Sequence, residues 1–109
     1  MLTRKKIIDE VQIFLTDLEN LGFPVGKAIL FGSIAKGKIH QYSDIDLAVW
    51  SSNFTNNYFE NIEKTVSLKR THKNIELHPF SMQDNKYNNP FIEEIENTGI
   101  IVSKESVAI

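Results

Sequence analysis

The chain has 109 residues, of which 41% are hydrophobic and 24% charged, a composition that predicts one packed globular domain over residues 1–109. Its net charge of -2 argues against a nucleic-acid coat or a polybasic membrane anchor, and we expect neither partner. The absence of cysteine excludes disulfides, thiolate zinc sites and a cysteine nucleophile, and is compatible with a cytoplasmic protein.

The first predicted element is an amphipathic helix over residues 3–21, with Thr3 as its N-cap. Gly22 and Pro24 end it. Its buried side is marked by apolar residues at three- and four-residue spacing: Ile7, Val11, Phe14, Leu15, Leu18 and Leu21.

The next two predicted elements are strands joined by a polar loop. Residues 28–31 form a short continuous apolar run, typical of a strand covered on both faces. Residues 32–42 contain glycines and polar side chains and predict a loop or a short helix with a loop. Residues 44–50 follow as the second strand.

The remaining chain predicts two helices and two strands. A helix is expected over residues 53–68, followed by a strand over 74–80, a short helix over 89–97 and a last strand over 100–102. Helices interleaved with strands predict an α/β domain, with helices packed on a mixed sheet. The expected buried side of the 53–68 helix is Phe54, Tyr58, Phe59, Ile62 and Val66.

Two acids occupy alternate positions in the second strand. Side chains two residues apart in a strand point to the same face, so Asp44 and Asp46 would project together. Their mutual repulsion would be relieved by divalent cations, and carboxylates at strand spacing can reach both ions of a two-Mg²⁺ site. The strand therefore predicts a metal site.

A phosphate-binding corner is predicted where the preceding strand ends. Gly32 has no side chain to block an approaching phosphate, and Ser33 offers a hydroxyl and an amide. A helix beginning at Ser33 would add the attraction of its N-terminus. Glu76, on the strand over 74–80, supplies a third carboxylate for the metals and an acceptor for the proton of an attacking hydroxyl.

The spacing Gly32-Ser33, ten residues, then Asp44-x-Asp46 resembles the signature of the DNA polymerase beta-like nucleotidyltransferase superfamily. The amino-acid sequence from Ser43 to Val49 is similar to that of minimal nucleotidyltransferases. Many of these are antitoxins encoded beside a HEPN-domain protein. The resemblance implies that Ser33 contacts the triphosphate and that Asp44 and Asp46 bind both metals. It implies that the third acid binds the catalytic metal.

The sequence departs from the family pattern at two positions. The third acid is commonly Asp, whereas here it would be Glu76, and Lys36 stands where Arg is more common. Lysine cannot make a bidentate phosphate contact. The basic residues Lys36, Lys38 and His40 form either a rim that guides the nucleotide or, as we favour, a solvated loop.

We therefore expect a Mg²⁺-dependent nucleotidyltransferase that moves a nucleoside monophosphate, with ATP or another NTP as donor, to a hydroxyl. The expected acceptor is a HEPN-domain partner protein, since 109 residues leave little room for an acceptor-binding domain. The alternatives are a non-catalytic antitoxin that assembles with its partner and transfer to a small molecule such as an aminoglycoside. Either a homodimer or a hetero-oligomer would be consistent with the apolar run at 100–102.

Three further residues receive no role in the site from the sequence. His72 and His78 stand alone without ligand spacing, and neither is assigned to a metal. Trp50, at the end of the strand that carries the two acids, would either cover the nucleotide or seal an interface.

Overall fold

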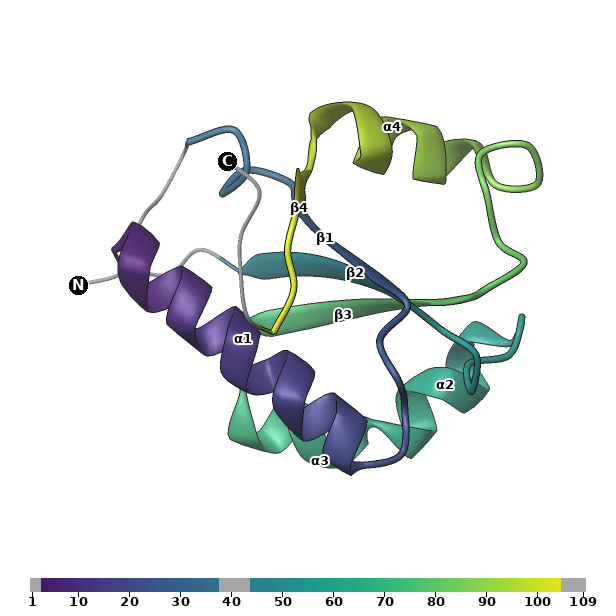
Figure 1. Ribbon diagram of the computed structural model, residues 1–109, viewed down its shortest axis with the longest axis horizontal. Coiled ribbons are helices and arrows are strands. Elements are labelled where there is room, and N and C mark those ends of the chain that lie inside the picture. Colours follow the sequence, from purple (N-terminus) through teal and green to yellow (C-terminus); the bar gives the residue numbers. More distant parts are fainter. Residues whose placement is uncertain (1–2, 38–43, 105–109) are drawn as a thin grey trace.

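The structure is a computed structural model that describes residues 3–37 and 44–104. It contains a four-stranded sheet in the order β3-β2-β1-β4 with helices on both faces (Figure 1). Strand β1 (Lys27–Phe31) pairs antiparallel with β2 (Ile45–Ser51) and with β4 (Ile100–Ile101), and β2 pairs parallel with β3 (Ile75–Ser81). The sequence prediction of a mixed sheet covered by helices is confirmed.

The helices form separate layers. Helix α1 (Arg4–Asn20) lies with α2 (Tyr58–Lys64) and α3 (Val66–Thr71) on one side of the sheet, and α4 (Pro90–Thr98) lies on the other (Figure 1). Thr3 caps α1 as predicted, because its hydroxyl accepts a hydrogen bond from the Lys6 amide at 3.2 Å. Within residues 3–37 and 44–104, no helix combines the length and apolar composition needed to cross a bilayer.

Each face of the sheet has its own hydrophobic core. The cluster under α1 contains alternate residues of β1, β2 and β3, and the cluster under α4 contains the residues between them. Trp50 belongs to the α4 cluster: it is 4% exposed, and its indole N–H donates to the Asp84 carbonyl at 2.9 Å. Its role is therefore in the core of the domain.

The segment predicted as one helix over 53–68 contains two short helices instead. Asn57 caps α2 by accepting a hydrogen bond from the Glu60 amide at 3.1 Å, so the helix starts at Tyr58. The two helices meet at Thr65, whose hydroxyl donates to the Asn61 carbonyl at 2.9 Å. A hydroxyl bonded to its own helix backbone often bends a helix, which accounts for the break.

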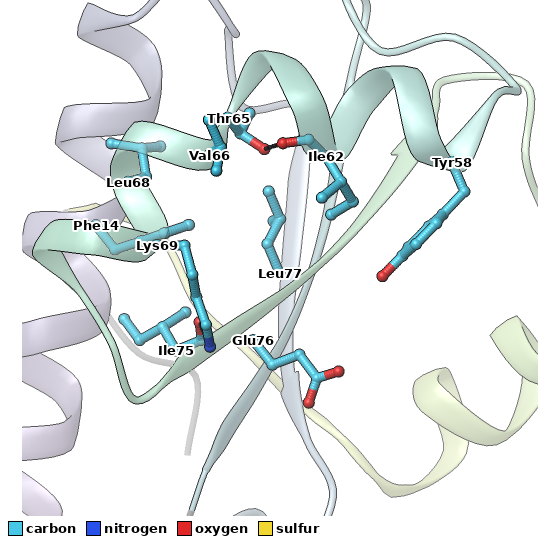
Figure 2. Close-up of a pocket in the computed structure, with 10 residues that line it drawn as sticks. All are labelled: Phe14, Tyr58, Ile62, Thr65, Val66, Leu68, Lys69, Ile75, Glu76 and Leu77. Atoms are coloured by element: carbon cyan, nitrogen blue, oxygen red, sulfur yellow. Dashed lines mark hydrogen bonds between the residues drawn. The ribbon is translucent and has the colours of Figure 1, made fainter.

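The predicted buried side of this segment is also largely wrong. Phe54 is buried, but Tyr58, Phe59 and Val66 are 47%, 79% and 46% exposed. The segment instead buries Asn61, which holds the Thr55 backbone through two hydrogen bonds of 2.9 and 2.8 Å. These bonds fix the rotation of α2 and leave apolar side chains outside, around a pocket between the helices and β3 (Figure 2).

A buried histidine joins α1 to the end of α3. His72 is 3% exposed; its Nδ1 lies 3.0 Å from Glu10 Oε1 and its Nε2 lies 2.8 Å from Asp17 Oδ2. Burial by itself would lower the pKa of His72, but the hydrogen bonds to Asp17 and Glu10 outweigh burial and raise that pKa. Because only protonated imidazole donates from both nitrogens, this arrangement favours the protonated form of His72.

Candidate metal and nucleotide site

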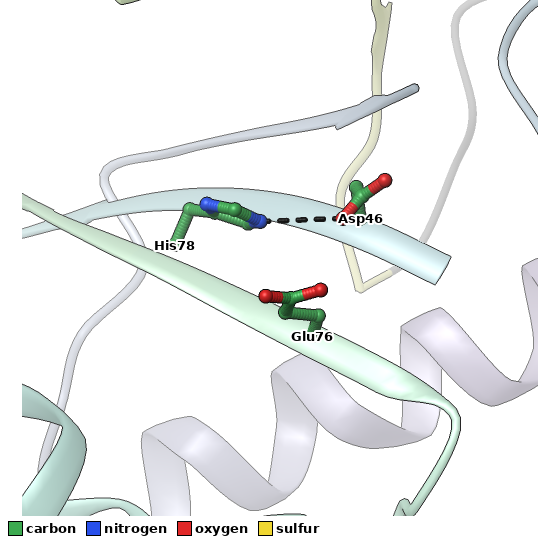
Figure 3. Close-up of side chains that lie close together, drawn as sticks. All are labelled: Asp46, Glu76 and His78. Carbon is green, nitrogen blue, oxygen red and sulfur yellow. Dashed lines mark hydrogen bonds and ion pairs between the residues drawn. The ribbon is translucent and has the colours of Figure 1, made fainter. Parts of the chain in front are cut away.

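Three side chains from the two parallel strands meet on the α4 face of the sheet. Asp46 of β2 and Glu76 of β3 are partners in the strand register. His78 is two residues further along β3, and its Nε2 lies 3.3 Å from Asp46 Oδ1 (Figure 3). One ligand atom from each of the three residues lies within 4.8 Å of the other two. Among the described residues, Asp46, Glu76 and His78 are the group of acidic and histidine side chains that lie close enough together to hold a metal ion.

The sequence places these acids by burying their neighbours. A strand alternates its side chains between the two faces, so apolar residues on one face force the residues between them to the other. A slip of one residue would exchange the acids with the core and is therefore strongly disfavoured. The neighbours buried under α1 are Ile45, Leu47, Ile75 and Leu77.

The glycine corner lies directly against one of these acids. Gly32 follows β1 and has φ of +78°, a backbone angle that residues with a side chain rarely adopt. A Cβ added to Gly32 would overlap Asp46 Oδ2 and lie 3.3 Å from Asp46 Cγ. Ser33 follows and is exposed. Two carboxylates and an imidazole are ligands that divalent cations accept. The residues present therefore fit a divalent metal ion, and nucleotide binding at Gly32 and Ser33 stays a prediction.

Several residues that the sequence assigned to the site lie outside the group of Asp46, Glu76 and His78. Asp44 is exposed and precedes β2, and it lies outside the three-residue group, so its role as a metal ligand stays a prediction. Residues 33–37 form hydrogen-bonded turns, in which the Lys36 amide donates to the Gly32 carbonyl at 3.3 Å, so no helix begins at Ser33. Lys36 is exposed, and Lys38 and His40 lie outside the described residues.

His78 is the residue that the sequence reasoning missed. Its position two residues after Glu76 on one strand was the available signal, because that spacing puts both side chains on the same face. Its ring also packs edge-on against Phe31, with ring centroids 4.9 Å apart, and lies 6.2 Å from the Phe91 ring. These contacts hold the imidazole next to Asp46, where it can bind a metal or orient the carboxylate.

The fold and the site define a small α/β domain of the nucleotidyltransferase type. Residues 15–107 match the family described as "Polymerase beta, Nucleotidyltransferase". Because this match covers most of the sequence, the chain belongs to that family, as the sequence signature indicated.

A solved structure agrees with this fold. A candidate nucleotidyltransferase from Sulfolobus solfataricus superimposes with a TM-score of 0.65 at 15% identity, covering 89% of this chain and 79% of that one. A second match, a toxin-antitoxin crystallised with AMP-PNP, has 27% identity and a TM-score of 0.48. It covers 64% of this chain and 56% of that one. No curated protein matches the chain.

Proposed function

We propose that this domain transfers a nucleoside monophosphate from an NTP, with ATP as the expected donor, to a hydroxyl group. The observation that carries the proposal is the register of Asp46 with Glu76 on one face of the sheet, with Gly32 in contact range of Asp46. Acids that meet beside a glycine turn suit a reaction in which charge is stabilised on phosphate oxygens.

The proposed roles follow from the chemistry of each side chain. Asp46 and Glu76, joined by Asp44, would hold two Mg²⁺ ions. When bound, such ions neutralise phosphate charge and lower the pKa of the acceptor hydroxyl. Ser33 would donate hydrogen bonds to the triphosphate, since its hydroxyl is exposed beside Gly32.

The reaction balances with these residues. The acceptor oxygen forms a bond to the α-phosphorus, and the bond from that phosphorus to the β-phosphate oxygen breaks. Glu76 takes the proton of the hydroxyl, and pyrophosphate leaves. His78 would orient Asp46, from which its Nε2 is 3.3 Å. Most of the catalysis would come from positioning and electrostatics.

We further propose that the acceptor is a HEPN-domain toxin and that its modification silences it in the cytoplasm. This role is supported by the resemblance of the Gly32-Ser33 and Asp44-x-Asp46 motif to minimal nucleotidyltransferases. The lack of cysteine is compatible with a reducing compartment. Two other roles, assembly with the toxin without catalysis and transfer to a small hydroxylated molecule, are outcomes that the experiment separates.

The test uses the domain and the HEPN-domain protein encoded by the adjacent gene, which the proposal expects to find. After incubation with Mg²⁺ and ATP, intact mass spectrometry should show one nucleotide adduct on the partner. Asp46→Asn should abolish it, whereas Asp9→Asn, the same change at an exposed position on α1, should not. Toxicity suppression that survives Asp46→Asn would indicate assembly alone. An absence of adduct with any of the four NTPs would refute transfer to the partner. Pyrophosphate release that then requires both an added aminoglycoside and Asp46 would indicate a small-molecule acceptor, and no release in either case would refute the transferase.

A further inference from the structure

The outer edge of β3 lies beside Glu76 and is not paired with another strand in the described part of the chain. The Ile45 amide donates to the Asn74 carbonyl at 2.7 Å, so even-numbered residues of β3 direct their backbone polar groups toward β2. Odd-numbered residues direct theirs outward. An edge of this kind can accept an additional strand from another protein.

Only a short part of that edge is open. At its start, Lys69 Nζ donates to the Ile75 carbonyl at 3.2 Å, and the Ile75 amide donates to the His72 carbonyl at 3.1 Å. Further along, Pro79 has no amide hydrogen to offer. The pairing capacity is therefore centred on Leu77, which lies between Glu76 and His78. Such an edge can receive one short segment in a defined register but does not support an extended added strand.

An apolar pocket lies next to this edge, mainly on the face opposite Asp46 and His78, and Glu76 is among the residues that line it. Its volume is about 240 Å³, below the roughly 300–1,000 Å³ of typical small-molecule sites. That size suits one or two side chains of a peptide. Figure 2 shows Ile62 and Leu77 in the middle of the pocket, with Tyr58 on one side and Lys69 on the other.

The charge at the pocket indicates what kind of segment fits. Tyr58 and Val66 leave about half of their surface exposed at its rim. Lys69 and Glu76 both line the pocket, so it carries one basic and one acidic group. The described contact of Lys69 is the Ile75 carbonyl, which does not neutralise the ammonium charge. A segment with apolar residues for the pocket and an acidic residue at the Lys69 end would complement both features.

We propose that the β3 edge and this pocket dock an extended segment of the acceptor protein in which a hydroxyl residue is flanked by apolar ones. In a paired strand, the residue opposite Leu77 points into the pocket, and its chain neighbours point to the face that carries Glu76 and His78. Cross-strand Cβ atoms lie about 4.5–5.5 Å apart. A tyrosine, serine or threonine next to the pocket residue would thus reach the acids.

This inference rests on the proposed transfer reaction, but its docking step can be measured without nucleotide. The probes are two pools of capped peptides of about six residues, each with one tyrosine and an aspartate at one end. In one pool the tyrosine is flanked by Val, Ile or Leu, and in the other by Ser, Asn or Gln. Methyl NMR without nucleotide reports on Ile62, Val66 and Leu77, and α-labelled ATP with Mg²⁺ reports on transfer.

We expect the apolar pool to shift these three methyl resonances and to be labelled about tenfold more than the polar pool. Val66→Asp should remove the shifts of the Ile62 and Leu77 methyls and the preference, with Val66→Ser as a milder second variant. Ile13→Asp, an equally exposed apolar position on α1, should change neither. N-methylation of every second peptide residue should abolish binding when the methylated amides face β3. Methylation of the other residues should leave binding intact, because only one edge of the peptide pairs.

The outcomes separate the two proposals. Methyl shifts without labelling would support docking and contradict the transferase. Labelling without preference for apolar peptides, unchanged by Val66→Asp, would support the transferase and overturn the docking site. Equal effects of N-methylation in both frames would overturn the strand pairing.

Discussion

Replacing Gly32 with alanine tests whether the glycine corner and Asp46 form one site. The position has φ of +78°, and an added Cβ would overlap Asp46 Oδ2. Gly37 provides a matched control, because its φ is +82° and a Cβ there would meet nothing within 4 Å. Both variants therefore carry the same kind of backbone strain, and only Gly32→Ala collides with the acid.

The structure gives the expected magnitude of each effect. A non-glycine residue at positive φ costs about 1–2 kcal/mol, so both variants should lose a similar free energy of unfolding. The collision at position 32 involves the end of a side chain, which can rotate away. Rotation would remove Asp46 from Glu76 and His78, and we expect metal affinity to fall about 10–100-fold. A misplacement of about 1 Å should reduce transfer by about 10²-fold.

Urea unfolding measures the strain, and Mn²⁺ titration followed by calorimetry measures the metal site independently of any acceptor. We expect near-wild-type Mn²⁺ affinity in Gly37→Ala and a clear loss in Gly32→Ala. If both variants bound Mn²⁺ equally well, the contact between Gly32 and Asp46 would have no role in the site. The reasoning from close approach would then be refuted.

Three other substitutions or conditions have defined outcomes. Since the pKa of His72 is raised on folding, its stabilisation is complete below about pH 6.5, the ordinary pKa, and is lost as pH rises through the folded value. Urea unfolding at several pH values should show this decline in the wild type and not in His72→Gln. Leu15→Ala, at a position with no exposed surface, should cost about 2–5 kcal/mol in the same assay; a loss under 1 kcal/mol would contradict the assigned core. Glu76→Gln should reduce the rate of nucleotidyl transfer at least about 100-fold while leaving the thermal midpoint near the wild-type value, and unchanged single-turnover kinetics would remove Glu76 from the site.

Most of the fold follows from periodicity in the sequence. The helix predicted over 3–21 is α1, and the strands predicted over 28–31 and 44–50 correspond to β1 and β2 with shifts of one residue at their ends. These elements bury long regular patterns, so the hydrophobic effect and local propensity agree. Alternation also predicted the face of each acid, but the register of Asp46 with Glu76 follows only from the structure.

The sequence predictions were wrong or incomplete where a polar residue makes a specific hydrogen bond in the folded protein. Asn61 is buried because it holds the Thr55 backbone, and no hydrophobic pattern predicts such a contact. Its burial rotates α2 and exposes Tyr58, which the pattern had placed inside. His78 was missed for a related reason, since its role depends on the pairing of two strands that are separated by two helices in the sequence.

Helix α4 covers the sheet up to the edge of the site, because its residue Phe91 packs near Phe31 and His78, with ring centroids 5.7 and 6.2 Å away. Its residues Ile92 and Ile95 pack against Trp50 and Phe80, near the ends of β2 and β3. Asp46 lies four residues before Trp50 on the same face, which is about 13 Å at strand spacing. A helix covering that distance would bury two carboxylates away from water, at a cost of several kcal/mol for each. The same face of the sheet can therefore be hydrophobic core at one end and open to a metal and a nucleotide at the other.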